Sequence, residues 1–248
     1  MSIRAQKESV AIEPKTLIQE APGEELRMLP LLHVVSVDSL TIEAPAPTFY
    51  LRYGKRLLDV TVSAVAIALL SPLFLAISVM IWLEDRSAVL YRQIRVGKDG
   101  EPFTFVKFRT MRPDADRVRS LLLGKSDAKG AAFKMKSDPR ITRVGKWLRR
   151  SSLDELPQLF DVFLGRMSVV GPRPHLPEEV RHYTSDQWIR LQVKPGLFCI
   201  REVSGRSELD FDQWLKLDAE YVHRQSFWLD LSLILRLVPA VISGRGAY

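Results

Sequence analysis

The sequence predicts an α+β fold that is mainly helical, with one apolar helix that enters a membrane and one β-hairpin. Three observations support this fold class. Residues 60–83 contain no charged side chain, two β-rich runs flank a turn at residues 97–100, and mostly helical patterns follow residue 115. With 248 residues, 46% of them hydrophobic, the chain can build one or two domains with a sizeable core.

Residues 1–50 are expected to form a disordered N-terminal extension. They mix Glu, Pro and Lys, and their one clearly apolar run lies at residues 29–37. Segments of this composition bury too little apolar surface to fold. The polar beginning also contains no apolar stretch of the kind found in cleaved secretory signals.

The charge of the chain is concentrated in its later part. The formal net charge is +7, but residues 1–51 hold more acidic than basic side chains, so residues 52–248 carry the positive excess. Such a surface attracts the phosphates of nucleotides, nucleic acids or anionic lipids, and charge alone does not distinguish them. The single cysteine, Cys199, excludes an intrachain disulfide, and one thiol with four scattered histidines does not make a structural zinc site.

The uncharged segment from Val60 to Leu83 is long enough to cross a bilayer. Ser71-Pro72 lies in its middle, where the proline removes a backbone donor and crowds the carbonyl four residues back, so a kink or break is expected. Basic residues flank both ends of the segment: Arg52, Lys55 and Arg56 before it, and Arg86, Arg92 and Arg95 after it. The positive-inside tendency therefore favours neither orientation.

A re-entrant helix-break-helix anchor over residues 51–85 satisfies both features. Each half would be roughly 16 Å long, about half of a hydrocarbon core, so the chain would dip into one leaflet and return. Ser71 would help to satisfy the backbone groups that Pro72 frees. An ordinary kinked spanning helix is the alternative interpretation.

Two β-rich runs, Ala88–Arg95 and Glu101–Arg109, are predicted to form the hairpin. Alternation along the second run puts Lys107 and Arg109 on one face, where they line a phosphate groove or face water. Helical patterns follow at residues 115–123, 141–150, 155–164, 185–192, 211–224 and 227–242. The pattern at 141–150 is basic and amphipathic, which suits an anionic lipid surface or water.

The acidic pair Asp154-Glu155 precedes Pro157. With Asp154 as the helix N-cap, Pro157 becomes the third helical residue, where its missing N–H costs no hydrogen bond. The positive end of the helix would favour an ionised Asp154 beside a bound phosphate, which suits a carboxylate nucleophile. Glu155 would hold Mg²⁺, a cation that takes oxygen ligands and phosphate oxygens. By itself, such a pair is more often only a helix cap.

Two prolines flank Arg173 in the sequence Gly171-Pro172-Arg173-Pro174. They restrict the local backbone and hold the guanidinium in one place at low entropic cost, as bidentate phosphate recognition requires. A rigid turn with a solvated arginine is the alternative.

Together these segments resemble the bacterial sugar transferases, the monotopic polyprenyl-phosphate phosphoglycosyl transferases, over residues 52–248. The motifs that carry the resemblance are Lys55-Arg56-Leu57-Leu58-Asp59, Ser71-Pro72, Lys107-Phe108-Arg109-Thr110-Met111, Asp138-Pro139-Arg140-Ile141-Thr142, Ser152-Leu153-Asp154-Glu155-Leu156-Pro157-Gln158-Leu159, Gly171-Pro172-Arg173-Pro174 and Ser204-Gly205-Arg206.

The resemblance implies transfer of a sugar 1-phosphate, a hexose such as glucose or galactose, from a UDP-sugar to undecaprenyl phosphate, with release of UMP. This reaction would initiate exopolysaccharide or O-antigen synthesis. The catalytic residues would be Asp154, which forms an aspartyl phosphosugar intermediate, and Glu155, which binds Mg²⁺. The resemblance also carries over a set of substrate-binding residues: Lys107, Arg109, Arg173, Arg206 and Asp218.

The same resemblance implies that residues 86–248 form the catalytic domain, on the cytoplasmic face of the bacterial inner membrane. The expected partners are the UDP-sugar, undecaprenyl phosphate and the membrane itself. No nucleic acid is expected, because the sequence has no recognisable groove-reading motif. A homodimer is left open.

One segment departs from the family pattern. After Lys-Pro-Gly and an aliphatic residue the family commonly has Thr and Gly, whereas this chain has the bulkier Phe198 and Cys199. Asp161 also stands where Asn is common. The departures in the segment Phe198 to Glu202 leave the sugar preference open, and they motivate an alternative function as a catalytically impaired, membrane-tethered scaffold or regulator of polysaccharide synthesis.

Overall fold

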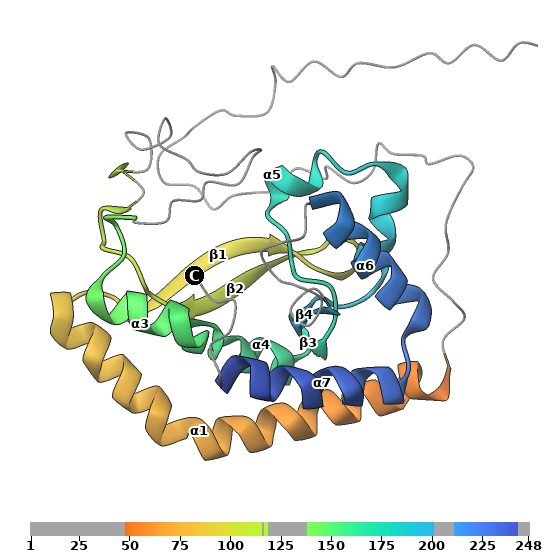
Figure 1. The fold of residues 1–248 in the computed structure, drawn as a ribbon, viewed down its shortest axis with the longest axis horizontal. Coiled ribbons are helices and arrows are strands. Elements are labelled where there is room, and N and C mark those ends of the chain that lie inside the picture. Colours follow the sequence, from red (N-terminus) through yellow and green to blue (C-terminus); the bar gives the residue numbers. More distant parts are fainter. Residues whose placement is uncertain (1–47, 116, 119–137, 201–210, 243–248) are drawn as a thin grey trace, which may run out of the picture. The chain divides into compact units, whose positions relative to one another are not determined.

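The computed structural model describes residues 48–115, 117, 118, 138–200 and 211–242. Figure 1 shows helices around two small sheets, and the predicted mainly helical α+β class is confirmed. The helices are α1 (Lys55–Asp85), α3 (Arg143–Ser151), α4 (Gln158–Leu164), α5 (Pro177–Val180), α6 (Phe211–Arg224) and α7 (Phe227–Ile242). The strands are β1 (Leu90–Val96), β2 (Pro102–Phe108), β3 (Ser168–Val170) and β4 (Gly196–Phe198).

Several predictions fall outside these residues. The disordered extension predicted for residues 1–50 lies outside the described part except for its last three residues, which lead into a π-helical turn at Tyr50–Gly54. The helix predicted at residues 115–123 is described only in part, and Arg206 is not described. The helix predicted at 185–192 is present as a 3₁₀ helix, Ser185–Gln192.

Helix α1 contains the whole apolar segment and continues through Pro72. Among the described helices it is the one long and apolar enough to cross a membrane, and only 11% of its most apolar window is buried by the protein. Figure 1 shows the helix change direction near its middle. The Ser71 hydroxyl donates to the carbonyl of Ala68, 2.9 Å away, which is the carbonyl that loses its helical partner to Pro72. The predicted helix-break-helix over 51–85 is therefore corrected to one bent, unbroken helix; its re-entrant topology stays a prediction.

Polar side chains bond the first turns of α1 to the rest of the chain. The Arg56 guanidinium donates to two carbonyls at the C-terminal end of α4, at 2.8 and 2.7 Å. The buried Asp59 carboxylate accepts hydrogen bonds from Ser168 Oγ at 2.9 Å and from the backbone N–H of Val169 at 2.8 Å. Because these hydrogen bonds are directional, they fix α1 against α4 and β3 more specifically than apolar contact alone.

Lys55 is the centre of a second polar cluster. Its Nζ donates to the carbonyl of Val170 at 2.9 Å, to the Tyr221 hydroxyl at 3.0 Å and to Asp230 Oδ2 at 2.5 Å. The carboxylate of Asp230 is fully buried and also accepts from the hydroxyls of Tyr50 and Tyr221, at 2.6 and 2.7 Å. The cluster joins α1, β3, α6 and α7.

The other end of α1 is also bonded to the same compact unit. The Glu84 carboxylate accepts a hydrogen bond from the backbone N–H of Arg143 at 2.8 Å, at the start of α3. Asp85 forms an ion pair with Arg109 and accepts from the hydroxyl of Ser87 at 2.9 Å. Polar contacts thus hold both ends of the apolar helix to one folded domain.

Strands β1 and β2 form the predicted antiparallel hairpin, in register from Leu90 opposite Phe108 to Val96 opposite Pro102. Asp99 and Gly100 adopt positive φ angles of 55° and 81°, which makes the tight turn between the strands. Strand β3 pairs in parallel with β4 in a separate two-stranded sheet.

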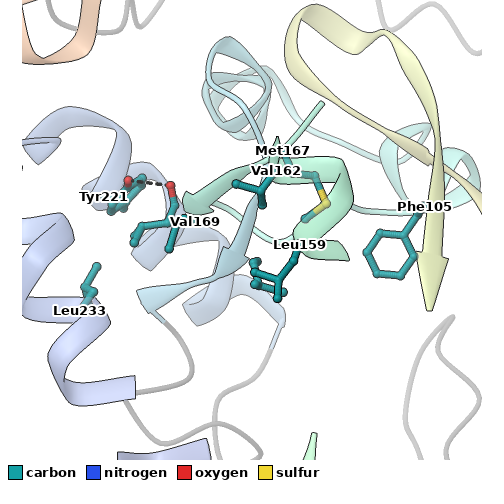
Figure 2. Packing of buried hydrophobic residues seen from close by; sticks show 9 residues of the cluster. Phe105, Leu159, Val162, Met167, Val169, Tyr221 and Leu233 are labelled. Atoms are coloured by element: carbon teal, nitrogen blue, oxygen red, sulfur yellow. Dashed lines mark hydrogen bonds between the residues drawn. The ribbon is translucent and has the colours of Figure 1, made fainter. Parts of the chain in front are cut away.

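The main core cluster lies between the hairpin, α4, the second sheet and the C-terminal helices. Figure 2 shows its side chains, with the Tyr221 hydroxyl directed at a backbone oxygen, the carbonyl of Val170 at 3.0 Å. The cluster comprises Phe105, Leu159, Val162, Met167, Val169, Val170, Leu197, Tyr221 and Leu233. A second cluster packs α1 on α3 and the hairpin through Ile77, Ile81, Phe108 and Leu148.

Gly145 lets helix α3 approach the end of the hairpin. A Cβ at this position would lie 2.0 Å from the carbonyl oxygen of Thr110, a distance that only backbone movement can relieve. We expect Gly145→Ala to lower the free energy of unfolding by about 3 kcal/mol, because the close-packed contact must open. Thermal unfolding of the detergent-solubilised protein measures the loss. At Gly97 the corresponding distance, to Glu101 O, is 3.1 Å, so Gly97→Ala should cost less; equal losses would contradict the steric explanation.

Candidate active site

The acidic pair lies in a 3₁₀ turn, Leu153–Glu155, between α3 and α4. Ser152 ends α3 with a positive φ of 56°, and α4 begins only at Gln158. Hydrogen bonds between residues three apart continue from the turn into α4. Pro157 has no N–H to complete an α-helical bond here, so the tighter turn forms instead. The prediction of Asp154 as the N-cap of the helix is therefore wrong: Asp154 lies inside the preceding turn.

Asp154 is 8% exposed and lies among cationic side chains. Burial and, to a smaller extent, the neighbouring charge of Glu155 raise its pKa to about 6. Lys107, Arg149 and Arg173 oppose this shift because each favours the ionised carboxylate. Asp154 is consequently an anion at neutral pH that takes up a proton in mildly acidic solution.

Glu155 makes a two-pronged contact with Arg173. The guanidinium Nη2 lies 2.5 Å from Oε1 and Nη1 lies 3.3 Å from Oε2. Burial alone would raise the pKa of Glu155, but the charges of Arg173, Lys107 and Arg95 hold it below its ordinary value. The two adjacent carboxylates therefore differ in their pKa values. Glu155 stays ionised in the pH range in which Asp154 takes up a proton.

Lys107 comes from strand β2, and the structure brings it to the acidic pair. Burial lowers its pKa, while the Asp154 carboxylate favours its charged form. Its ammonium also lies 5.4 Å from the centre of the Tyr91 ring, on the adjacent strand. The structure thus brings Lys107 and Arg173 together with Asp154 and Glu155, and their substrate-binding roles stay predictions.

Arg109 was expected on the same face as Lys107, and its substrate-binding role stays a prediction. Strand β2 ends at Phe108, and the backbone N–H of Arg109 still donates to the carbonyl of Val89 at 2.9 Å. Its guanidinium instead pairs with Asp85 and the hydroxyl of Ser87 at the end of α1, and the residue is 9% exposed. The structure assigns Arg109 a contact with the apolar helix and not with the acidic pair.

Asp218 lies behind the site, on α6. It forms a buried ion pair with Arg190, whose Nη2 is 2.5 Å from Oδ2. The same nitrogen donates to the backbone carbonyl of Arg173 at 2.9 Å. Asp218 therefore reaches Arg173 through Arg190. Arg206, the remaining predicted substrate contact, lies outside the described residues.

Two site cations were not predicted. Arg149 is placed beside Asp154 by α3, with its Nε donating to Thr110 Oγ1 at 2.8 Å. Arg95 of β1 contributes charge near Glu155 and donates to the carbonyl of Pro174 at 3.0 Å. Arg149 follows the apolar Leu148 in a helical pattern, a signal that it lies at the edge of the buried face. No local sequence pattern distinguishes Arg95.

The donor set at the acidic pair suits one mode of Mg²⁺ binding. Within the described residues no cluster of three or more His, Cys, Asp or Glu side chains can hold a metal ion. Mg²⁺ commonly binds one or two carboxylates and completes its shell with water and substrate phosphates. The half-buried, ionised carboxylate of Glu155 beside Asp154 fits that mode and does not fit an all-protein metal cage.

Comparison with known proteins identifies the family. A family model described as "Bacterial sugar transferase" matches residues 50–244. The chain belongs to the bacterial sugar transferase family. It is therefore a transferase by family, and the resemblance found in the sequence motifs is confirmed.

Individual members of the bacterial sugar transferase family are similar to this chain at moderate identity. The galactosyl transferase CpsE of Streptococcus agalactiae serotype III is 39% identical over 197 residues, which cover 78% of this chain and 43% of CpsE. The exopolysaccharide production protein ExoY of Rhizobium meliloti is 39% identical over 199 residues, 79% of this chain and 88% of ExoY. A Caulobacter vibrioides UDP-glucose:undecaprenyl-phosphate glucose-1-phosphate transferase is 37% identical over 224 residues, 86% of this chain and 79% of that protein. The chain thus spans less than half of CpsE and most of the other two.

The raised pKa of Asp154 predicts the acid limb of the pH profile. If ionised Asp154 is required, kcat/KM should be full above its pKa of about 6 and fall as the pH drops below it. Lys107→Met removes a charge that favours the ionised form, so the acid limb should move to higher pH. Initial rates of UMP release across pH 5–8 measure the shift. Lys146→Met, at an exposed position on α3, is the matched control, and equal shifts in both variants would contradict the assignment.

Proposed function

We propose that this bacterial sugar transferase moves a hexose 1-phosphate from a UDP-sugar to undecaprenyl phosphate through a covalent intermediate on Asp154. The observation that carries the proposal is a buried, ionisable Asp154 surrounded by Lys107, Arg149 and Arg173. The names of the relatives support the reaction class, since one denotes a galactosyl transferase and another a glucose-1-phosphate transferase acting on UDP-glucose and undecaprenyl phosphate.

The reaction divides one displacement at phosphorus into two. A carboxylate oxygen of Asp154 attacks the β-phosphorus of the UDP-sugar; the bond to the bridging oxygen breaks, and UMP leaves with the electron pair. A phosphate oxygen of undecaprenyl phosphate then attacks the same phosphorus, the aspartyl oxygen leaves, and the Asp154 carboxylate is restored. The product is undecaprenyl diphosphate joined to the sugar, and the covalent intermediate splits one difficult displacement into two easier ones.

The charges around the pair suit a diphosphate. Four cations, Lys107, Arg149, Arg173 and Arg95, act on the two carboxylates Asp154 and Glu155. The positive excess favours a diphosphate, whose charge grows on the leaving oxygen as the phosphoryl bond breaks. Glu155 would hold Mg²⁺, which when bound supplies further neutralisation of the diphosphate oxygens.

Phe198 and Cys199, which are bulkier than the residues common in the family, do not favour the alternative function as a catalytically impaired scaffold. Phe198 packs against the main core cluster and Cys199 is 2% exposed, so both are accommodated inside the fold. The acidic pair keeps its contacts with Arg173 and its cationic surroundings. We therefore favour an active enzyme, with glucose and galactose as the two candidate sugars because the relatives' names divide between them.

The decisive experiment measures UMP release by the detergent-solubilised protein with undecaprenyl phosphate, Mg²⁺, and UDP-glucose or UDP-galactose in turn. Asp154→Asn should lower the rate by about a thousandfold or more, because the nucleophile is lost. The matched control is Asp161→Asn, which removes another buried carboxylate. Asp161 pairs with the partly exposed Arg166, and this variant should retain activity. Without the lipid acceptor, intact mass should show a sugar phosphate adduct on wild type only. Release by Asp154→Asn at the wild-type rate would refute the assigned nucleophile.

We further propose that α1 is re-entrant and that the catalytic domain lies on the cytoplasmic face of the bacterial inner membrane. The bend near Pro72 and the contacts at both helix ends support this topology. A 31-residue helix is about 46 Å long, more than a hydrocarbon core. If it crossed the bilayer directly, its two ends would lie on opposite sides, and one domain could not bond to both.

The topology is tested by labelling single cysteines introduced into a Cys199→Ser background. Tyr53→Cys and Arg92→Cys lie at exposed positions before and after the apolar helix. A membrane-impermeant thiol reagent should label neither in intact spheroplasts and both in inside-out vesicles. Labelling of the two positions from opposite sides would establish a spanning helix and would contradict the re-entrant proposal.

A further inference from the structure

A buried ion pair lies directly behind the segment that carries Arg173. Arg190, from the Ser185–Gln192 helix, and Asp218, from α6, have side chains that are only 2% and 1% exposed. One guanidinium nitrogen of Arg190 bonds both to Asp218 and to the carbonyl oxygen of Arg173. We propose that Arg190 and Asp218 are positioning residues that set the orientation of Arg173 through its backbone, a proposal that rests on the phosphoglycosyl transfer proposed above.

The backbone around Arg173 has little freedom left. The rings of Pro172 and Pro174 fix their own φ angles, and a residue before proline is restricted to extended conformations. Most carbonyls along this stretch are also bonded. The pairs are Val170 O with Lys55 Nζ, Pro172 O with Gly196 N, Pro174 O with Arg95 Nη1 and His175 O with Val96 N. The hydrogen bond from Arg190 to the carbonyl oxygen of Arg173 adds a further fixed carbonyl to this stretch. It lies at the residue whose side chain contacts Glu155.

Arg190 is itself held rigidly enough to act as a fixed donor. Its Nη1 donates to the Tyr183 hydroxyl at 2.6 Å and lies 2.6 and 2.8 Å from the ring nitrogens of His175. The centre of the guanidinium lies 5.5 Å from the Trp214 ring. A planar fork can bond Asp218, a hydroxyl and a carbonyl at once, which a single ammonium group cannot do in the same geometry.

The position of Arg173 matters because its side chain faces the acidic pair. Its guanidinium contacts both oxygens of Glu155. If the backbone carbonyl were released, the guanidinium would sample other positions and this contact would weaken. Asp218 therefore affects the reaction through Arg190 and Arg173, without touching substrate.

Replacing Arg190 alone would leave the buried charge of Asp218 without its partner and would endanger folding. The informative variant neutralises both, Arg190→Gln with Asp218→Asn. The matched control, Arg166→Gln with Asp161→Asn, neutralises another pair with a buried aspartate. Thermal unfolding of both variants shows whether each protein folds.

The test is a double-mutant cycle with Arg173→Ala, read out as kcat/KM for UMP release and as affinity for UDP by calorimetry. With Arg173 present, the combined substitution Arg190→Gln and Asp218→Asn should lower kcat/KM and UDP affinity by about 10-fold. In the Arg173→Ala background the same substitution should have almost no further effect. The control pair should change neither readout.

The outcomes separate this proposal from the proposed function. Equal losses with and without Arg173 would show that Arg190 and Asp218 support the fold only and would overturn the positioning role. Wild-type protein that releases no UMP from any UDP-sugar would refute the proposed function instead. In that case the double-mutant cycle measured by UDP affinity would still decide whether Arg190 acts through Arg173.

Discussion

Lys55 and Asp230 form an ion pair inside the protein, with Nζ and Oδ2 2.5 Å apart and Asp230 fully buried. A buried carboxylate without its partner is strongly destabilising, so the helices that carry these residues can pack in only one way. Lys55 opens the apolar helix α1, and its ammonium also bonds the carbonyl of Val170 at the end of β3. The segment 171–174 starts at this point. The interaction that places the membrane helix therefore also places the loop of the candidate site.

The loop 171–174 is held from two sides, and this arrangement explains how Arg173 can serve a charged site. In front, its guanidinium meets the carboxylate of Glu155; behind, its carbonyl meets Arg190, which is paired with Asp218. A long cationic side chain at a surface would lose much of its electrostatic effect to motion and solvent. Fixed in this way, the charge acts on Asp154 and Glu155 from a defined position, which is the condition for electrostatic preorganisation.

Local patterns predicted the hairpin and most of the helices but not the parallel pair β3 and β4. Alternation and the turn at 97–100 identified the hairpin, and the 3.6-residue pattern identified α6 and α7, because these signals depend only on neighbouring residues. The N-cap assignment of Asp154 failed because Pro157 lacks the N–H of an α-helical bond and a 3₁₀ turn forms instead. The bond of Arg109 to Asp85, 24 residues away, is not encoded by a local pattern. Arg95 reaches the site through a contact with Pro174, 79 residues away, which no local pattern encodes.

The same limit applies to the family motifs. Lys107 and Arg109 belong to one motif, yet one lies at the acidic pair and the other bonds the end of α1 through Asp85. A residue of a family motif can therefore contribute to the candidate site or hold the apolar helix. Only its contacts in the structure distinguish these two roles. The two residues are nevertheless linked through the backbone. Strand β2 carries Lys107 to the site and leads directly to Arg109 at the end of α1. The position of Lys107 at the acidic pair and the bond between α1 and Arg109 therefore depend on the same strand.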